Sequence, residues 1–217
     1  MIRIGRMIRI MEYEISHLVR NQAVVDVASS AAAPALRPRT PGVVLGPFYP
    51  VPPPEGASAD LCRNALRNGE VQARPLELCG RVLNAAGMAV VGAQVEIWHA
   101  DGSGCYHHVS APDTRQIDAN FLGYGTQRTD ADGRFRFWTL VPGPYDQDGS
   151  RRAPHIHFQV TGRFDRLITQ MFFPCEPLNS RDRWYGFTVQ PERLVATVIS
   201  DTRAALSLSW DIVLASG

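Results

Sequence analysis

The chain has 217 residues, enough for one sizeable domain with an extension and a buried core. Hydrophobic residues make up 45% and charged residues 20%, and the net charge of +1 indicates neither a nucleic-acid surface nor an acidic tail. No apolar run of about 18 residues is present, so the sequence predicts no transmembrane helix. The four cysteines match no CxxC zinc pattern, which favours thiols in a reducing compartment over a disulfide framework.

Residues 1–40 are predicted to form an N-terminal extension and linker. Met1-Ile2-Arg3-Ile4 recurs as Met7-Ile8-Arg9-Ile10, so Met1, Met7 and Met11 are all candidate start sites. An apolar stripe predicts a short amphipathic helix over 11–26, followed by a linker rich in Ala, Ser and Pro. Charged residues interrupt the apolar stretch that a signal peptide needs, which favours a cytoplasmic location.

Residues 41–217 are predicted to form the main domain. Short segments of alternating apolar and polar residues follow one another, separated by turns that contain Gly, Asp and Pro. These segments are 76–83, 93–98, 134–138, 156–160, 167–172 and 208–214. The pattern predicts an all-β fold, an antiparallel β-sandwich with long loops, with one short helix within 191–206.

His155-Ile156-His157 lies in one of these predicted strands. Residues i and i+2 of a strand face the same side, so His155 and His157 can be directed at one point. Two imidazoles alone suit several divalent metals, and a zinc or divalent-iron site therefore stays open. If Tyr106 and Tyr145 join them as phenolates, the ligand set becomes harder and anionic, which favours Fe(III).

A non-catalytic interpretation also fits part of this pattern. Pro142-Gly143-Pro144-Tyr145, after Asp132-Gly133 and the strand that follows, is typical of transthyretin-like β-sandwich modules that bind a partner or a carbohydrate. In such modules the tyrosine is a packing residue. That alternative gives no reason for Arg152, His155 and His157 to occur together.

The motifs taken together resemble the intradiol ring-cleavage dioxygenases, the family of protocatechuate 3,4-dioxygenase catalytic (beta) subunits and catechol 1,2-dioxygenase catalytic domains. The resemblance extends over about 41–217. It is carried by Gly46-Pro47-Phe48-Tyr49 and by segments 95–100, 104–106, 129–133, 142–145, 152–157, 167–171 and 210–214. No single one of these segments is specific, but the whole series is.

The resemblance implies a non-haem Fe(III) cofactor held by Tyr106, Tyr145, His155 and His157. It implies that Tyr145 also acts in catalysis, by leaving the metal and accepting a proton from the substrate. The implied reaction is cleavage of a catecholic ring by O2 between the two hydroxylated carbons, giving a cis,cis-muconate-type dicarboxylate in aromatic compound degradation.

The resemblance also implies the groups around the substrate. Arg152 would be catalytic, because a planar and permanently charged guanidinium can stabilise negative charge on the ring. Gln170, Trp98 and Tyr49 would contact the substrate. In the protocatechuate enzymes a non-iron partner subunit supplies a Gly-Pro-x-Tyr segment, whereas here that segment is on the same chain as the iron ligands. We therefore expect a homo-oligomer, with a non-iron partner subunit as the alternative and no nucleic acid or membrane as partner.

The preferred catechol stays open. A protocatechuate 3,4-dioxygenase-like activity is the leading prediction, with catechol, hydroxyquinol or chlorocatechol 1,2-dioxygenase activity as alternatives. The sequence departs from the protocatechuate enzymes at Cys105 and at Asp146-Gln147, which flank the two tyrosines. His99, His107 and His108 are either surface residues or residues that contact the metal ligands from behind, and the surface position is the favoured prediction.

Overall fold

The computed structural model describes residues 35–63, 69–111 and 117–216. The predicted extension with its helix over 11–26, most of the linker and the three candidate start sites lie outside these residues. Among the residues described, no helix has both the length and the apolar character needed to cross a bilayer.

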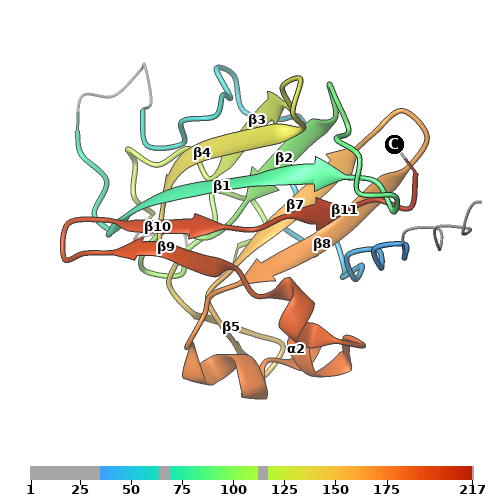
Figure 1. The fold of residues 1–217 in the computed structure, drawn as a ribbon. Helices are drawn as coiled ribbons and strands as arrows, with labels where there is room; N and C mark the ends of the chain where they lie inside the picture. Colours follow the sequence, from blue (N-terminus) through green and yellow to red (C-terminus); the bar gives the residue numbers. More distant parts are fainter. Residues whose placement is uncertain (1–34, 64–68, 112–116, 217) are drawn as a thin grey trace, which may run out of the picture. The chain divides into compact units, whose positions relative to one another are not determined.

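Two β-sheets stack face to face (Figure 1). The first contains β4 (Arg134–Leu140), β1 (Pro75–Leu83), β10 (Leu206–Ser209), β11 (Ile212–Val213) and β9 (Thr197–Asp201). The second has the order β3 (Tyr124–Arg128), β2 (Gln94–Trp98), β7 (His155–Thr161) and β8 (Arg166–Phe172). A hairpin of β5 (Tyr145–Gln147) and β6 (Ser150–Arg152) stands apart from both sheets.

The predicted β-sandwich is confirmed, with two differences in detail. β1 pairs in parallel with β10 and β11, so the first sheet is mixed rather than antiparallel. The predicted helix within 191–206 is only a 3-10 turn, η2 (Pro191–Leu194), after which the chain enters β9. Within the described residues, the other helical segments are η1 (Pro177–Arg181) and α2 (Arg183–Phe187), which lie below the sheets in Figure 1.

Strand periodicity decides which side chains fill the core between the sheets. In β4, Phe135 and Phe137 are buried, while Arg134 and Arg136 are exposed. β7 is different, because all of its residues from His155 to Val160 are buried. Ile156, Phe158 and Val160 belong to the main core, so His155, His157 and Gln159 face the opposite side of the second sheet.

A second and smaller apolar cluster covers that opposite side. Its buried members are Phe48, Trp98, Ala100, Tyr106 and Tyr124. Because this cluster lies over the histidine face of β7, the two imidazoles are enclosed although they point away from the main core. The fold therefore creates a buried site outside the space between its two sheets.

Candidate metal centre

His155 and His157 come from the same face of β7, as the alternation predicted. Their Nε2 atoms are 3.2 Å apart, and both side chains are at most 2% exposed. His155 Nδ1 lies 2.6 Å from the carbonyl oxygen of Ala153. Because a carbonyl can only accept, Nδ1 carries the proton and the Nε2 lone pair of His155 is directed at His157.

Burial keeps both histidines neutral. Desolvation lowers the pKa of His155 and of His157 well below the ordinary histidine value, and the Arg152 guanidinium lowers both further. Neutral imidazole is the form that binds metal ions. The other ring nitrogen of His157, Nδ1, is buried without a hydrogen-bond partner among the residues described.

The backbone of the Gly46 segment and the ring of Trp98 confine His157. The Trp98 indole stacks on the imidazole with ring centroids 4.9 Å apart and an interplanar angle of 13°. Gly46 has a φ of +76°, and a Cβ at this position would lie 2.9 Å from His157 Cε1. Only glycine leaves the ring in its present place, which explains the need for this residue in the Gly46-Pro47-Phe48-Tyr49 segment.

The two tyrosines reach the histidines from separate segments, Tyr106 from the loop after β2 and Tyr145 from the first position of β5. Tyr145 Oη lies 3.4 Å from His155 Nε2. The Tyr106 ring lies 5.2 Å from the Tyr145 ring and 6.3 Å from the His157 ring, measured between centroids. Tyr106 Oη is buried and has no hydrogen-bond partner among the residues described. All four predicted ligand side chains thus come together, although 51 residues separate Tyr106 from His157 in the sequence.

The loop before Tyr106 is held by one buried carboxylate. Asp101 Oδ1 accepts hydrogen bonds from the backbone N–H groups of Ser103 and Cys105, at 2.9 and 3.0 Å, and from the Ser103 hydroxyl. Its Oδ2 accepts the N–H of Asp118 at 2.8 Å. Asp101 is 1% exposed, so this network fixes the turn that delivers Tyr106.

The donor set and the spacing of donor atoms around His155 Nε2 are compatible with a single ferric ion. Two donors that are each about 2.1 Å from one ion stand roughly 3.0–3.4 Å apart, which matches the separations of 3.2 Å and 3.4 Å at His155 Nε2. Desolvation raises the pKa of Tyr106 well above its ordinary value and raises that of Tyr145, so without a cation both stay phenols. A trivalent cation would favour the phenolates and give the unpartnered Tyr106 oxygen a partner.

In the part of the chain that the structure describes, no three or more side chains of His, Cys, Asp or Glu lie close enough together to hold a metal ion. Any metal at His155 and His157 therefore needs the tyrosine oxygens or external ligands. This chemistry favours the ferric interpretation over the zinc alternative, because two phenolates match a trivalent hard cation better.

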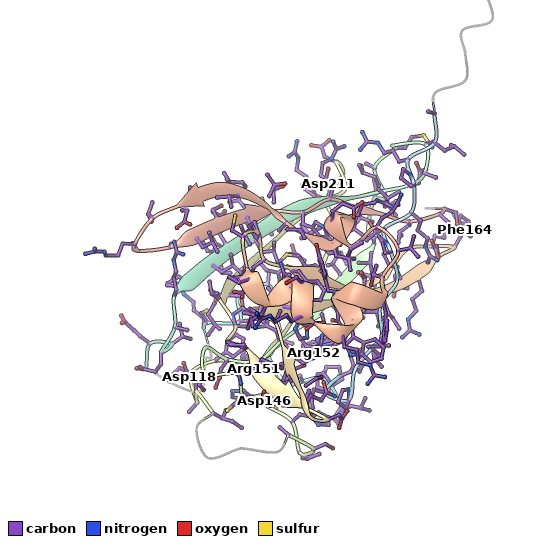
Figure 2. The ribbon with its side chains drawn as sticks, turned by 90° about the horizontal axis from the view of Figure 1, so that it is seen from below. Asp118, Asp146, Arg151, Arg152, Phe164 and Asp211 are labelled. Carbon is purple, nitrogen blue, oxygen red and sulfur yellow. The ribbon has the colours of Figure 1, made fainter. Side chains whose placement is uncertain are left out.

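Arg152 is tied to Tyr145 by the β5–β6 hairpin. The two residues are direct cross-strand partners, and Asp146 pairs with Arg151 at the next position. A two-residue turn with positive φ at Asp148 and Gly149, +49° and +74°, closes the hairpin, as an Asp-Gly pair favours. Figure 2 shows Arg151, Arg152 and Asp146 on this hairpin. Arg152 Nη1 lies 3.4 Å from Tyr145 Oη.

Arg152 also has two buried partners, one of which the sequence did not reveal. Its Nη2 donates to Gln170 Oε1 at 2.8 Å, and its Nε donates to Asp182 Oδ2 at 2.8 Å. Gln170 is the cross-strand neighbour of His157, which explains why it faces the site. Asp182 precedes α2 and caps it, and an aspartate before a helix is a cap signal that the sequence could have revealed. Its pairing with Arg152 spans 30 residues, so no local sequence pattern predicts it.

Tyr49 and Trp98 lie side by side, with ring centroids 4.9 Å apart. The Tyr49 hydroxyl donates to Glu96 Oε1 at 2.9 Å, and Trp98 is 1% exposed. Trp98 therefore supports the His157 ring, and Tyr49 supports Trp98. Contact of either residue with substrate stays a prediction.

The prediction of a surface position was wrong for His99, which is fully buried. Its Nδ1 donates to the carbonyl of Ala100, and its Nε2 accepts from the Thr139 hydroxyl at 2.7 Å. Desolvation lowers its pKa to about 4. His107 and His108 are half-buried, and His107 Nε2 lies 3.0 Å from the carbonyl oxygen of Asp118.

Comparison with known proteins agrees with this site. A family model described as Dioxygenase matches residues 45–216. The chain belongs to the intradiol dioxygenase family. It is an enzyme of the oxidoreductase class, in a family that uses non-haem Fe(III) and cleaves aromatic rings.

Individual relatives give the same result. The chain is 39% identical to a protocatechuate 3,4-dioxygenase beta chain of Burkholderia cepacia, over 71% of this chain and 70% of that protein. It is 32% identical to catechol 1,2-dioxygenase 1 of Acinetobacter lwoffii, over 68% of this chain but only 51% of that protein. A solved dioxygenase domain from Streptomyces sp. SirexAA-E superposes with a TM-score of 0.65 at 27% identity, covering 83% of this chain and 100% of that domain.

Proposed function

We propose that this dioxygenase cleaves a catecholic ring with O2 between the two hydroxylated carbons, using Fe(III) held by Tyr106, Tyr145, His155 and His157. The observation that carries the proposal is the convergence of two neutral imidazole Nε2 atoms, 3.2 Å apart, with two buried phenols, one of which has no hydrogen-bond partner. When bound, the iron would supply a Lewis acid for the catechol oxygens and a route for electron density from the ring to O2.

Charge balance explains why the site tolerates burial. Two phenolates and one hydroxide compensate a trivalent ion, so no net charge needs to be buried at the metal. Arg152 and Asp182 form a separate neutral pair, at 3% and 0% side-chain exposure. A catechol dianion that replaces the hydroxide and one tyrosinate preserves this balance.

Tyr145 is our candidate for the group that receives a substrate proton. Its oxygen lies next to both His155 Nε2 and Arg152 Nη1, each at 3.4 Å, so it stands between the ligand set and a fixed positive charge. If Tyr145 is a phenolate in the loaded enzyme, its Oη would accept one of the two catechol protons and become a neutral phenol, while the hydroxide would take the other proton and become water. Arg152 Nη1 would then be available to stabilise negative charge on the substrate.

The substrate we propose is a catechol of the protocatechuate type, which the 39% identity to a protocatechuate 3,4-dioxygenase beta chain supports. Hydroxyquinol and catechol remain the alternative substrates, because proteins that act on each are 30–32% identical to the chain. Muconate-type products would place the enzyme in aromatic degradation, and the proposed cellular location is the cytoplasm.

The proposed assembly is a homo-oligomer in which each chain completes its own site. Phe48 packs on Tyr106 with ring centroids 4.4 Å apart, and Gly46 abuts His157. The Gly46-Pro47-Phe48-Tyr49 segment of the same chain therefore already occupies the position next to the proposed metal. The proposed catalytic domain is 41–217, with residues 1–40 as an extension.

Oxygen uptake over protocatechuate, catechol, hydroxyquinol and chlorocatechols, with product spectra, tests the proposal. We expect a colourless muconate-type product and a fall in kcat of about 10²–10³-fold in Arg152→Gln. Arg151→Gln is the matched control, since its side chain is 48% exposed and pairs with Asp146 instead, and it should keep kcat. A yellow product of extradiol cleavage, or no oxygen uptake with any catechol, would contradict the proposal.

A further inference from the structure

Asp182 makes an unusually complete set of hydrogen bonds for a buried carboxylate. Oδ2 accepts from Arg152 Nε at 2.8 Å and from the Ala153 N–H at 2.9 Å. Oδ1 accepts from the N–H groups of Trp184 and Tyr185 at 3.0 and 3.2 Å. Both oxygens therefore have two donors each, and the side chain is 0% exposed. An anion with four fixed donors in a dry environment cannot move without losing hydrogen bonds.

This carboxylate determines which edge of the Arg152 guanidinium remains available. The edge formed by Nε and Nη2 is bonded to Asp182 and to Gln170, both at 2.8 Å. Gln170 is itself fixed, because its Nε2 donates to the Val44 carbonyl at 3.1 Å. Two anchors on one edge of a planar group set both its position and its plane. The remaining nitrogen, Nη1, is directed at Tyr145 Oη.

We propose that Asp182 is a positioning residue that holds Arg152 in the orientation required for ring cleavage, so that Nη1 faces the reacting oxygens. The inference rests on the proposed function and adds to it a residue from the 173–188 segment, outside the ligand strands and the hairpin. Because Asp182 also caps α2, it connects the packing of that segment to the geometry of the guanidinium.

A purely structural role is the competing explanation, and a double-mutant cycle separates the two. In Asp182→Asn one carboxylate oxygen becomes an amide NH2, which cannot accept a hydrogen bond. Whichever way the amide is turned, the variant therefore loses either the pairing with Arg152 or the cap of α2. A misplacement of about 1 Å can cost about 10²-fold in rate, so we expect kcat to fall by about that factor while KM changes little. In the Arg152→Gln background the same change should have almost no further effect on kcat.

Glu176→Gln is the matched control, because Glu176 caps the preceding η1 turn through Leu178 N–H at 2.9 Å and has no contact with Arg152. It should leave kcat within about twofold, in line with other exchanges away from such a network. Equal losses of kcat from Asp182→Asn in the wild-type and Arg152→Gln backgrounds, or an equal loss from Glu176→Gln, would overturn the proposal.

A second measurement requires neither activity nor a metal. In the metal-free wild-type protein, the Nε–H proton of Arg152 should give a slowly exchanging NMR signal, because it is buried and bonded to Asp182. Fast exchange of that proton in the wild type would overturn the proposal, even if Asp182→Asn does not fold. If no catechol is cleaved, the proposed function fails, while the exchange rate still decides whether Asp182 holds Arg152.

Discussion

Replacement of Gly46 by alanine tests whether the Gly46 segment holds His157 in its metal-binding position. The added Cβ would lie 2.9 Å from His157 Cε1 and 3.5 Å from Nε2. Carbon atoms prefer roughly 3.5–4.0 Å, so the ring must move by about 0.5 Å or more. Trp98 stacks on the face of the imidazole, which limits the directions in which the ring can move.

The expected loss in the free energy of unfolding of Gly46→Ala has two parts. The φ of +76° disfavours alanine by about 1 kcal/mol, and overpacking against a buried ring costs about 1–3 kcal/mol more. Gly56→Ala separates these parts, because Gly56 has the same φ of +76° but nothing within 4 Å of the added Cβ. We therefore expect Gly46→Ala to be the less stable variant by about 1–3 kcal/mol.

The assay is denaturant unfolding of both metal-free variants, followed by titration with iron. Displacement of a ligand ring should weaken iron binding by about 10–100-fold in Gly46→Ala, while Gly56→Ala should bind as the wild type does. Equal stability of the two variants together with unchanged iron affinity would refute the reasoning.

Two further predictions concern buried groups around the ligands. The pKa values of His99, His155 and His157 are lowered in the folded protein, so unfolding takes up protons below about pH 6.5. The free energy of unfolding of the metal-free protein should therefore decrease as the pH falls from about 6.5, by at most about 4 kcal/mol per pH unit, and denaturant titrations that show constant stability between pH 7 and 5 would contradict this. Asp101→Ala removes the acceptor of the part-buried Ser103 and Cys105 N–H groups and should cost about 0.5–1.5 kcal/mol for each hydrogen bond. Because those groups belong to the turn before Tyr106, this variant should also lose iron affinity, and calorimetry with iron showing wild-type binding would count against it.

The sequence was informative wherever the signal was local. Alternation in β7 placed His155 and His157 on one face, and the same rule explains why Gln170, opposite His157, joins them. The Asp148-Gly149 pair is a local turn signal that aligns Tyr145 with Arg152.

Contacts between distant segments could not be predicted in this way. Asp182 looks like an ordinary helix cap in the sequence, yet it forms a buried ion pair with Arg152. The parallel pairing of β1 with β10 is equally non-local, because the two strands lie near opposite ends of the domain's sequence. His99 was expected at the surface, whereas Ala100 and Thr139 satisfy both of its ring nitrogens inside the protein.

The most direct test of the metal centre is the visible spectrum of the purified protein during titration with iron. We predict a tyrosinate-to-iron charge-transfer band that saturates at about one iron per chain, as expected for one four-residue site. Tyr106→Phe and Tyr145→Phe should each weaken and shift the band. A wild-type protein that stays pale after iron is added, or a band unchanged in both variants, would contradict a ferric site built from Tyr106, Tyr145, His155 and His157.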